Sequence, residues 1–358
     1  MKIGSFEFNL RELSGSFGDF GTLFPLAIGY IVVCGLDPAG FLVMMGLANI
    51  VTGLIYRLPM PIEPMKVLAV VAIAQRWPPS MVYASGFVMG VVWLIFGLTG
   101  IMGWIARVTP RSVIRGIQAS LGVLLAIEAV KLIWPAWLLG AAAVVIVLGI
   151  VLMAFRGDLA GVKGVAFRLP PLTGFSLGEV WKSLLLAGFA QIPLTATNAV
   201  IATSALIKKY WPDRPVSENQ LALNQGVMNL VVPFFGGMPL CHGAGGLAGQ
   251  YYFGARTGGT NILEGFLEIM LGLFLAGSIA SLFAAFPSAI IGAMMLLVGV
   301  ELMKFTRDVR WSLDLIPLGA TAAVSVLTNM AFGFAAGMAM HYLILLITRR
   351  RQTSNTAE

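Results

Sequence analysis

The sequence predicts an all-α integral membrane protein with about fourteen membrane segments arranged as two inverted repeats. Composition is the first reason: 58% of the 358 residues are apolar and 11% are charged, with a mean hydropathy of +0.89. Soluble domains carry about 25% charged residues, so a soluble class is excluded. The second reason is that apolar runs recur along the chain, and the third is that motifs of the first half return in the second.

Thirteen apolar runs have the length of a membrane segment, or of half of one, at a rise of about 1.5 Å per residue. In the first half they cover 16–34, 38–56, 64–75, 81–105, 112–133 and 136–155. In the second half they cover 180–207, 219–235, 241–253, 261–284, 288–304, 312–329 and 331–348. No intervening stretch is long enough for a separate soluble domain, and we expect no cleaved signal peptide because the N-terminus lacks that pattern.

Five pairs of short motifs occur in the same order in the two halves, at offsets of 173 to 180 residues. The pairs are GLANIV at 46–51 with GVMNLV at 226–231, Met60-Pro61 with Met238-Pro239, Gly86-Phe87 with Gly265-Phe266, Pro110 with Pro287, and IEAVK at 127–131 with VELMK at 300–304. A nearly constant offset over most of the chain indicates an internal duplication. We therefore expect a first repeat over 1–176 and a second over 177–358.

The basic residues predict the orientation of the chain. The net charge is +7 and the pI is about 9.6, but Lys and Arg cluster at the ends of the apolar runs, as the positive-inside rule requires, so no nucleic-acid partner is expected. Lys208, Lys209 and the RRR tail at 349–351 stay inside only if the chain crosses once more, within 157–176. We therefore expect a short seventh segment there, although it carries two basic residues. Both termini are then cytoplasmic in the cell membrane, and seven segments per repeat invert one repeat relative to the other, which is typical of transporters.

Two segments are broken at matching positions of the repeat. Three prolines interrupt LPMPIEPMKVLAVVAIAQ at 58–75. In GGMPLCHGAGGLAGQYYFGARTGG at 236–259, the glycines at 236, 237, 243, 245 and 246 have the same effect. Each should enter the membrane extended and become helical halfway, so that two half-helix N-termini face each other near the bilayer midplane. A helix N-terminus offers unpaired N–H groups and about half a positive charge, which favours an anion. Close helix packing is the competing explanation for many of the 42 glycines.

Candidate ligands for an anion follow from these breaks. Backbone N–H groups are expected from Met65, Lys66 and Val67 and from Gly243, Ala244 and Gly245, and side chains from Thr22, Gln191, Thr195, Asn198 and His242. Asp19 and Glu63 are carboxylates at membrane depth and are the candidate carriers of a coupled proton.

Simpler interpretations of these residues stay open. Glu63 and Lys66, three residues apart, can neutralise each other, and His242 can be a hydrogen-bonded structural residue. The threonine and asparagine side chains can serve only to bond neighbouring helices. A lone histidine without a carboxylate partner is a poor metal ligand, so no metal or other cofactor is expected.

Four motifs resemble those of the molybdate transporter family, short relatives of the sulfate permease group. They are FGDFGTLFP at 17–25, PMPIEPMK at 59–66, TNAVIA at 197–202 and the long, specific MPLCHGAGGLAGQYYFGARTGG at 238–259. The resemblance implies the fold shared by sulfate and uracil permeases, with fourteen segments and a core domain that moves against a gate domain. The core corresponds here to about 14–106 and 180–284, and the gate to about 110–176 and 287–348.

The resemblance also implies molybdate as the substrate, with sulfate as a second candidate. The sequence differs from the family pattern in three features. Glu63 stands where that family often has glutamine, the seventh segment is weakly apolar, and the C-terminal regulatory domain of sulfate permeases is not expected in this chain. A fixed negative charge beside an anion site leaves the coupling of transport to protons open.

Several functional alternatives also remain at this point. A nucleobase–cation symporter of the same fold and a passive anion channel would share the broken segments. Molybdate, tungstate and sulfate differ mainly in size, and a homodimer is neither indicated nor excluded. An enzyme is not expected. The sequence lacks HExxH and GxxxxGK[ST], and its GxSxG match, GFSLG at 174–178, does not follow a strand of an α/β sheet, as a nucleophile elbow requires. Of the two Gly-Asp pairs only Gly18-Asp19 lies in one of the apolar runs, whereas an intramembrane aspartyl protease needs two carboxylates.

Overall fold

The computed structural model describes residues 2–18, 20–133, 165–285 and 312–355, with single positions between 296 and 309. Nearly all of the regular structure in these ranges is helical. Five of the described helices are long and apolar enough to cross a membrane, which makes the chain a multi-pass membrane protein. The segments expected at 136–155 and, for the most part, at 288–304 lie outside the described residues.

The first half begins with a short hairpin and continues through helices. Its elements are β1 (Lys2–Ile3), β2 (Phe6–Glu7), α1 (Leu10–Ser16), α2 (Phe20–Val32), α3 (Pro38–Tyr56), β3 (Glu63–Pro64), α4 (Lys66–Ala74), α5 (Pro79–Thr99), α6 (Met102–Val108) and α7 (Arg111–Ile133). Helix α3 shows how local sequence sets these bounds. Asp37 caps its first turn by accepting hydrogen bonds from the N–H groups of Ala39 and Gly40, and proline occupies the first helical position.

The second half opens with one continuous helical path from Leu177 to Tyr210. The path comprises α9 (Leu177–Ser183), η2 (Leu184–Gly188), α10 (Phe189–Leu194), η3 (Thr195–Ile201) and α11 (Ala202–Tyr210), and it is followed by α12 (Glu218–Val231), η4 (Val232–Phe235), β4 (Leu240–Cys241), α13 (Ala244–Tyr252), α14 (Gly259–Ala285), α16 (Leu315–Leu327) and α17 (Met330–Asn355). Both η2 and η3 are π-helical and flank Pro193. Proline has no N–H and its ring crowds the preceding turn, so the helix widens around it instead of ending.

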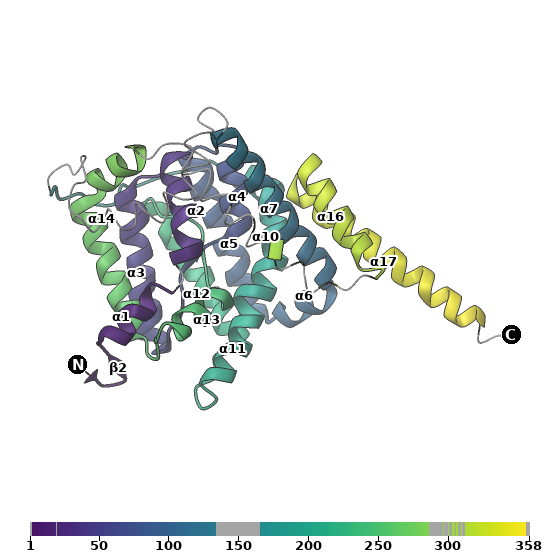
Figure 1. The fold of residues 1–358 in the computed structure, drawn as a ribbon, viewed down its shortest axis with the longest axis horizontal. Helices are drawn as coiled ribbons and strands as arrows, with labels where there is room; N and C mark the ends of the chain where they lie inside the picture. Colours follow the sequence, from purple (N-terminus) through teal and green to yellow (C-terminus); the bar gives the residue numbers. More distant parts are fainter. Residues whose placement is uncertain are drawn as a thin grey trace.

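Helices of the first half pack against helices of the second half. Helix α3 packs along α14 and α12 packs along α5, while α16 packs on α7 and α17 (Figure 1). Small residues make the first two contacts close: a Cβ at Gly265 would lie 2.3 Å from the carbonyl oxygen of Gly46, and one at Gly226 would lie 2.6 Å from the amide nitrogen of Leu94. Gly46 and Gly226 are equivalent positions of the motif pair GLANIV and GVMNLV. In both contacts, a glycine at the equivalent position of the repeat allows the two helices to approach closely.

The expected seventh segment is not a helix where the structure describes it. Residues 157–164 lie outside the described part, and 165–176 form no regular secondary structure. The N–H groups of Ala166 and Arg168 donate to the carbonyl oxygens of Phe274 and Leu273 on α14 at 3.1 and 2.7 Å. The physical reason is the Pro-Pro pair at 170–171, which removes two consecutive helix donors and keeps the preceding residue extended.

Candidate anion site at the crossing of two half-helices

The two broken segments meet as a short antiparallel ladder. Glu63 pairs with Cys241, Pro64 pairs with Leu240, and the N–H of Met65 donates to the carbonyl oxygen of Pro239 at 3.0 Å. All four ladder residues are buried. Because α4 begins two residues after β3, and α13 begins three residues after β4, the N-termini of the two half-helices lie beside each other.

Two buried asparagines hold the extended chain on either side of the ladder. The side chain of Asn261 donates to the carbonyl oxygen of Met60 and accepts from its N–H, at 2.6 and 2.9 Å. Asn229 makes the same pair of bonds with Leu240, at 2.6 and 2.8 Å. Both side chains are fully buried. They satisfy backbone groups that a continuous helix would have paired, which buried backbone at membrane depth requires.

These two asparagines were missed as candidates from the sequence. A signal for them existed, because amide side chains are costly in apolar helices and tend to have partners there. Asn229 lies in one of the repeated motifs, and its equivalent Asn49 on α3 receives a hydrogen bond from Asn261 at 2.9 Å.

The N-terminus of α4 is capped by a side chain from α10. The Oε1 atom of Gln191 accepts hydrogen bonds from the N–H groups of Val67 at 2.8 Å and Leu68 at 3.2 Å. Its Nε2 atom donates to the hydroxyl of Thr195, and both side chains are buried. Gln191 and Thr195 therefore do lie at the first half-helix, but the N–H of Val67 already has an acceptor within the protein.

The N-terminus of α13 faces a carboxylate. Glu63 is 2% exposed, and a Cβ at Gly243, the residue that precedes α13, would lie 2.5 and 2.9 Å from its two carboxylate oxygens. The Nζ atom of Lys66 forms an ion pair with the same carboxylate, as the simpler interpretation of these two residues expected. The side chain of Lys66 stays 18% exposed. The positive end of α13 and a partly accessible cation therefore flank one negative charge of the protein.

The first turn of α13 is open on one side. Gly245 is exposed, and a Cβ built there would have no atom within 4 Å; Ala244 beside it is half-buried. Asn198, on η3, is half-buried as well. The side of this turn at Gly245 can therefore accommodate added atoms without displacing protein atoms.

His242 contacts the first broken segment and the end of α3. It is fully buried, its Nδ1 atom lies 3.2 Å from the carbonyl oxygen of Pro61, and its ring meets Tyr56 edge-on at 6.1 Å. These contacts fit a structural histidine that ties one broken segment to the other. Within the part of the chain that the structure describes, its Nε2 atom has no hydrogen-bond partner.

The anion-binding or proton-carrying role of every candidate remains a prediction, and two candidates are not located by the structure. Asp19 lies outside the described residues, and Thr22 lies in α2 with a side chain that is not described. Among the described residues, no three His, Cys, Asp or Glu side chains form a group that could hold a metal ion.

Comparison with known proteins identifies the fold and the family. The transmembrane domain of the cyanobacterium bicarbonate transporter BicA is similar with a TM-score of 0.63 and 17% identity, over 92% of this chain and 97% of that one. The structure of SLC26A9 is similar with a TM-score of 0.67 and 13% identity, over 95% of this chain and 65% of that one. The fold with its crossed half-helices is thus that of the SLC26-type membrane transporters.

The sequence defines the family more narrowly. Residues 11–125 and 183–302 match the family described as "Molybdate transporter of MFS superfamily". The chain is also 32% identical to Molybdate transporter 1 of Arabidopsis thaliana, over 95% of this chain and 89% of that protein. The chain belongs to the molybdate transporter family, which confirms the resemblance seen in its motifs.

Proposed function

We propose that the protein is a secondary active transporter of a tetrahedral oxyanion, with molybdate as the first candidate and sulfate and tungstate as competitors. The observation that carries the proposal is the crossing of α4 and α13, where two helix N-termini and Lys66 surround a site that is open at Gly245. Relatives named as molybdate transporters support the choice of ion. Transport proceeds by alternating access across the cell membrane, with both termini in the cytoplasm.

The anion is held by partial charges, with Lys66 as the accessible cation. In the proposed bound state, the N–H groups of Gly243, Ala244 and Gly245 donate to the oxyanion, and Asn198 completes the site from η3. Each charge-assisted hydrogen bond contributes about 1.5–3 kcal/mol net, so a few of them offset part of the cost of dehydrating the ion. Because no single contact dominates, the ion can also leave. Gln191 keeps the first turn of α4 in place, so that its dipole points at the same site.

Glu63 is the first candidate carrier of a proton that is transported together with the anion. A dianion at the first turn of α13 would lie beside the Glu63 carboxylate, and two like charges 4 Å apart repel by about 4 kcal/mol at an effective dielectric constant of about 20. Protonation of Glu63 removes this repulsion and frees Lys66 to face the anion. Proton and substrate would then bind together. Asp19 remains the second candidate carrier.

Uptake into proteoliposomes tests the transport class. Radioactive molybdate should accumulate above its external concentration when an inward proton gradient is imposed, and excess sulfate or tungstate should compete according to its affinity. Equilibration without accumulation would mean a channel, and competition by uracil instead of oxyanions would mean a nucleobase symporter.

Replacement of Glu63 tests the coupling. Glu63→Gln keeps the shape of the side chain and an acceptor for Lys66 but carries no charge. We expect molybdate uptake by this variant to lose its dependence on the proton gradient while binding is retained at alkaline pH. If uptake stays gradient-driven in Glu63→Gln and fails in Asp19→Asn, the proton carrier is Asp19.

A further inference from the structure

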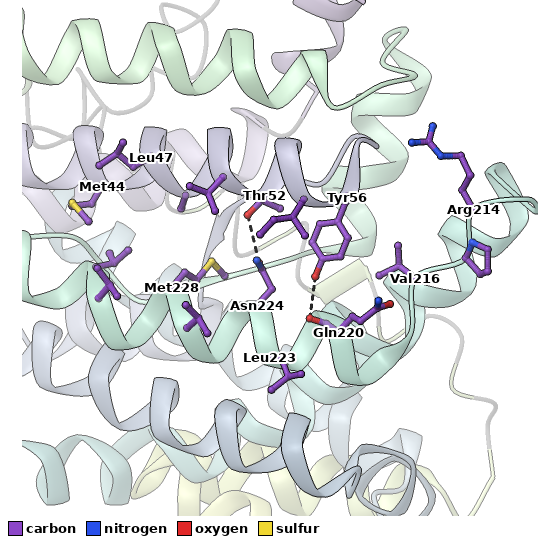
Figure 2. A pocket seen from close by; sticks show the side chains of 17 residues that line it. Met44, Leu47, Thr52, Tyr56, Arg214, Val216, Gln220, Leu223, Asn224 and Met228 are labelled. Atoms are coloured by element: carbon purple, nitrogen blue, oxygen red, sulfur yellow. Dashed lines mark hydrogen bonds between the residues drawn. The ribbon is translucent and has the colours of Figure 1, made fainter. Parts of the chain in front are cut away.

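A groove of about 720 Å³ runs between α3 and α12, and none of the anion-site candidates lines it (Figure 2). Its walls are mainly apolar and include Leu47, Val51 and Ile55 of α3 and Val227 and Val231 of α12. These five side chains are 43–59% exposed, so they would face hydrocarbon in a membrane. The groove exists because α3 packs on α14 and α12 packs on α5, which leaves few contacts between α3 and α12 themselves.

Two polar contacts join the helices along the groove. The hydroxyl of Thr52 lies 3.4 Å from Oδ1 of Asn224, and the hydroxyl of Tyr56 donates to the carbonyl oxygen of Gln220 at 3.0 Å (Figure 2). These bonds tie α3 to α12. The two helices that line the groove are therefore directly connected.

One end of the groove is basic. Arg214 lies there, beyond Tyr56 and Gln220, and its guanidinium donates to the carbonyl oxygen of Arg57 at 3.2 Å (Figure 2). Arg57 is itself exposed, and Trp211 joins the aromatic cluster of Tyr210 and Tyr251 just before Arg214 in the chain. Tryptophan and tyrosine mark the level of lipid headgroups, where arginine meets phosphate.

The dimensions of the groove match one lipid leaflet. From Tyr56 to Met44, α3 rises by about 18 Å at 1.5 Å per residue, slightly more than half of a hydrocarbon core of about 30 Å. A groove with a cationic mouth and an apolar interior of this length has the chemical pattern of an anionic lipid: a phosphate at one end and an acyl chain at the other.

We propose that the α3–α12 groove binds one anionic glycerophospholipid, with an acyl chain between Val51 and Val227 and the phosphate on Arg214. This site is independent of the ion that the protein transports. Charge complementarity selects an anionic headgroup over a zwitterionic one, because a basic residue near the membrane surface contributes about 1 kcal/mol toward anionic lipid, a factor of about five in affinity.

Native mass spectrometry of the full chain tests the site. The delipidated protein, purified in detergent, is titrated with phosphatidylglycerol and in parallel with phosphatidylcholine of the same acyl chains. One tight adduct of phosphatidylglycerol is expected, with phosphatidylcholine bound about fivefold more weakly. Val227→Trp fills the groove and should remove the tight adduct. Ile95→Trp is the matched control, because Ile95 on α5 is 51% exposed, Val227 is 56% exposed, and Ile95 does not line the groove.

The headgroup contact has its own pair of variants. Arg214→Gln should erase the preference for phosphatidylglycerol, Arg214→Lys should keep it, and Arg168→Gln, at an exposed arginine outside the groove, should change nothing. A tight adduct that survives in Val227→Trp, or a headgroup preference that survives in Arg214→Gln, would overturn the proposal. A dimer that Val227→Trp abolishes without any loss of bound lipid would also overturn it, because the face would then belong to a second copy of the chain.

Discussion

The two broken segments interrupt their helices at the same place but by different chemistry. The first uses Pro59, Pro61 and Pro64, which lack N–H groups and fix the backbone, and the helix that follows is capped from outside by Gln191. The second uses glycines: Gly236 takes a left-handed conformation at φ 78° where η4 ends, and Gly243 leaves room for the Glu63 carboxylate.

The two half-helices therefore differ in how accessible their first turns are. In the first broken segment, the N–H groups of Val67 and Leu68 already donate to Gln191. The same segment carries the charged side chains of Glu63 and Lys66. The second half-helix has an exposed first turn at Gly245. The proline-broken segment is therefore held by contacts within the protein, whereas the glycine-broken segment has an exposed first turn.

The largest expected effect comes from removing the support of the second segment. Asn229→Leu leaves the buried N–H and C=O of Leu240 without partners, and each unsatisfied group costs about 1–3 kcal/mol, so about 2–6 kcal/mol of unfolding free energy is at stake. Thermal unfolding in detergent should show a large drop in melting temperature. Asn224→Leu is the control, because Asn224 is half-buried and its amide makes one long bond with a side chain. Equal melting temperatures for both variants would show that the ladder does not depend on Asn229.

A smaller effect should distinguish two glycines of the same segment. Gly243→Ala places a methyl group within 2.5 Å of a Glu63 oxygen and should lower stability by about 1–3 kcal/mol, as overpacking does. Gly245→Ala meets no atom within 4 Å and should leave stability unchanged. Combining Gly243→Ala with Glu63→Ala, which removes the crowding carboxylate, should recover much of the loss in a double-mutant cycle. If Gly245→Ala proved as destabilising as Gly243→Ala, the space beside Gly245 in the first turn of α13 would be filled rather than open.

The smallest effect concerns the cap of the first half-helix. Gln191→Leu removes the single oxygen that accepts from the N–H groups of both Val67 and Leu68. Because these groups lie in the first turn of a helix, the expected cost is that of a lost helix cap, about 0.5–2 kcal/mol. Gln191→Glu keeps an acceptor but adds a negative charge, so it should weaken molybdate binding with little change in melting temperature. Binding that is indifferent to Gln191→Glu would mean that the first half-helix does not face the anion.

The sequence predicted the parts of this site that depend on local patterns. Prolines and glycines marked both breaks, the repeat matched them to each other, and the three-residue spacing of Glu63 and Lys66 allowed their ion pair. The cap from Gln191 and the support from Asn261 were beyond such patterns, because they join residues 124 and 201 positions apart. Nothing in one sequence fixes which distant helix supplies a partner.

The crossing by the seventh segment stays a prediction, but its described part is not helical. The charge rule required a crossing between 156 and 180 and says nothing about secondary structure, and the Pro-Pro pair at 170–171 prevents a helix in the described stretch, which bonds to α14. The π-helical turns around Pro193 were missed as well, because the apolar run at 180–207 was treated as one uninterrupted segment.

Calorimetric titration of molybdate into Gly245→Val tests the central claim most directly. The added side chain meets no protein atom but occupies the open side of the first turn of α13, where the anion is proposed to bind. Gly319→Val on α16 is the matched control, because Gly319 is also helical, exposed and free of atoms within 4 Å of its Cβ position. We predict that Gly245→Val loses molybdate binding by at least about tenfold while Gly319→Val binds like the unmodified protein. Undiminished binding in a folded Gly245→Val variant would place the anion elsewhere and contradict the account.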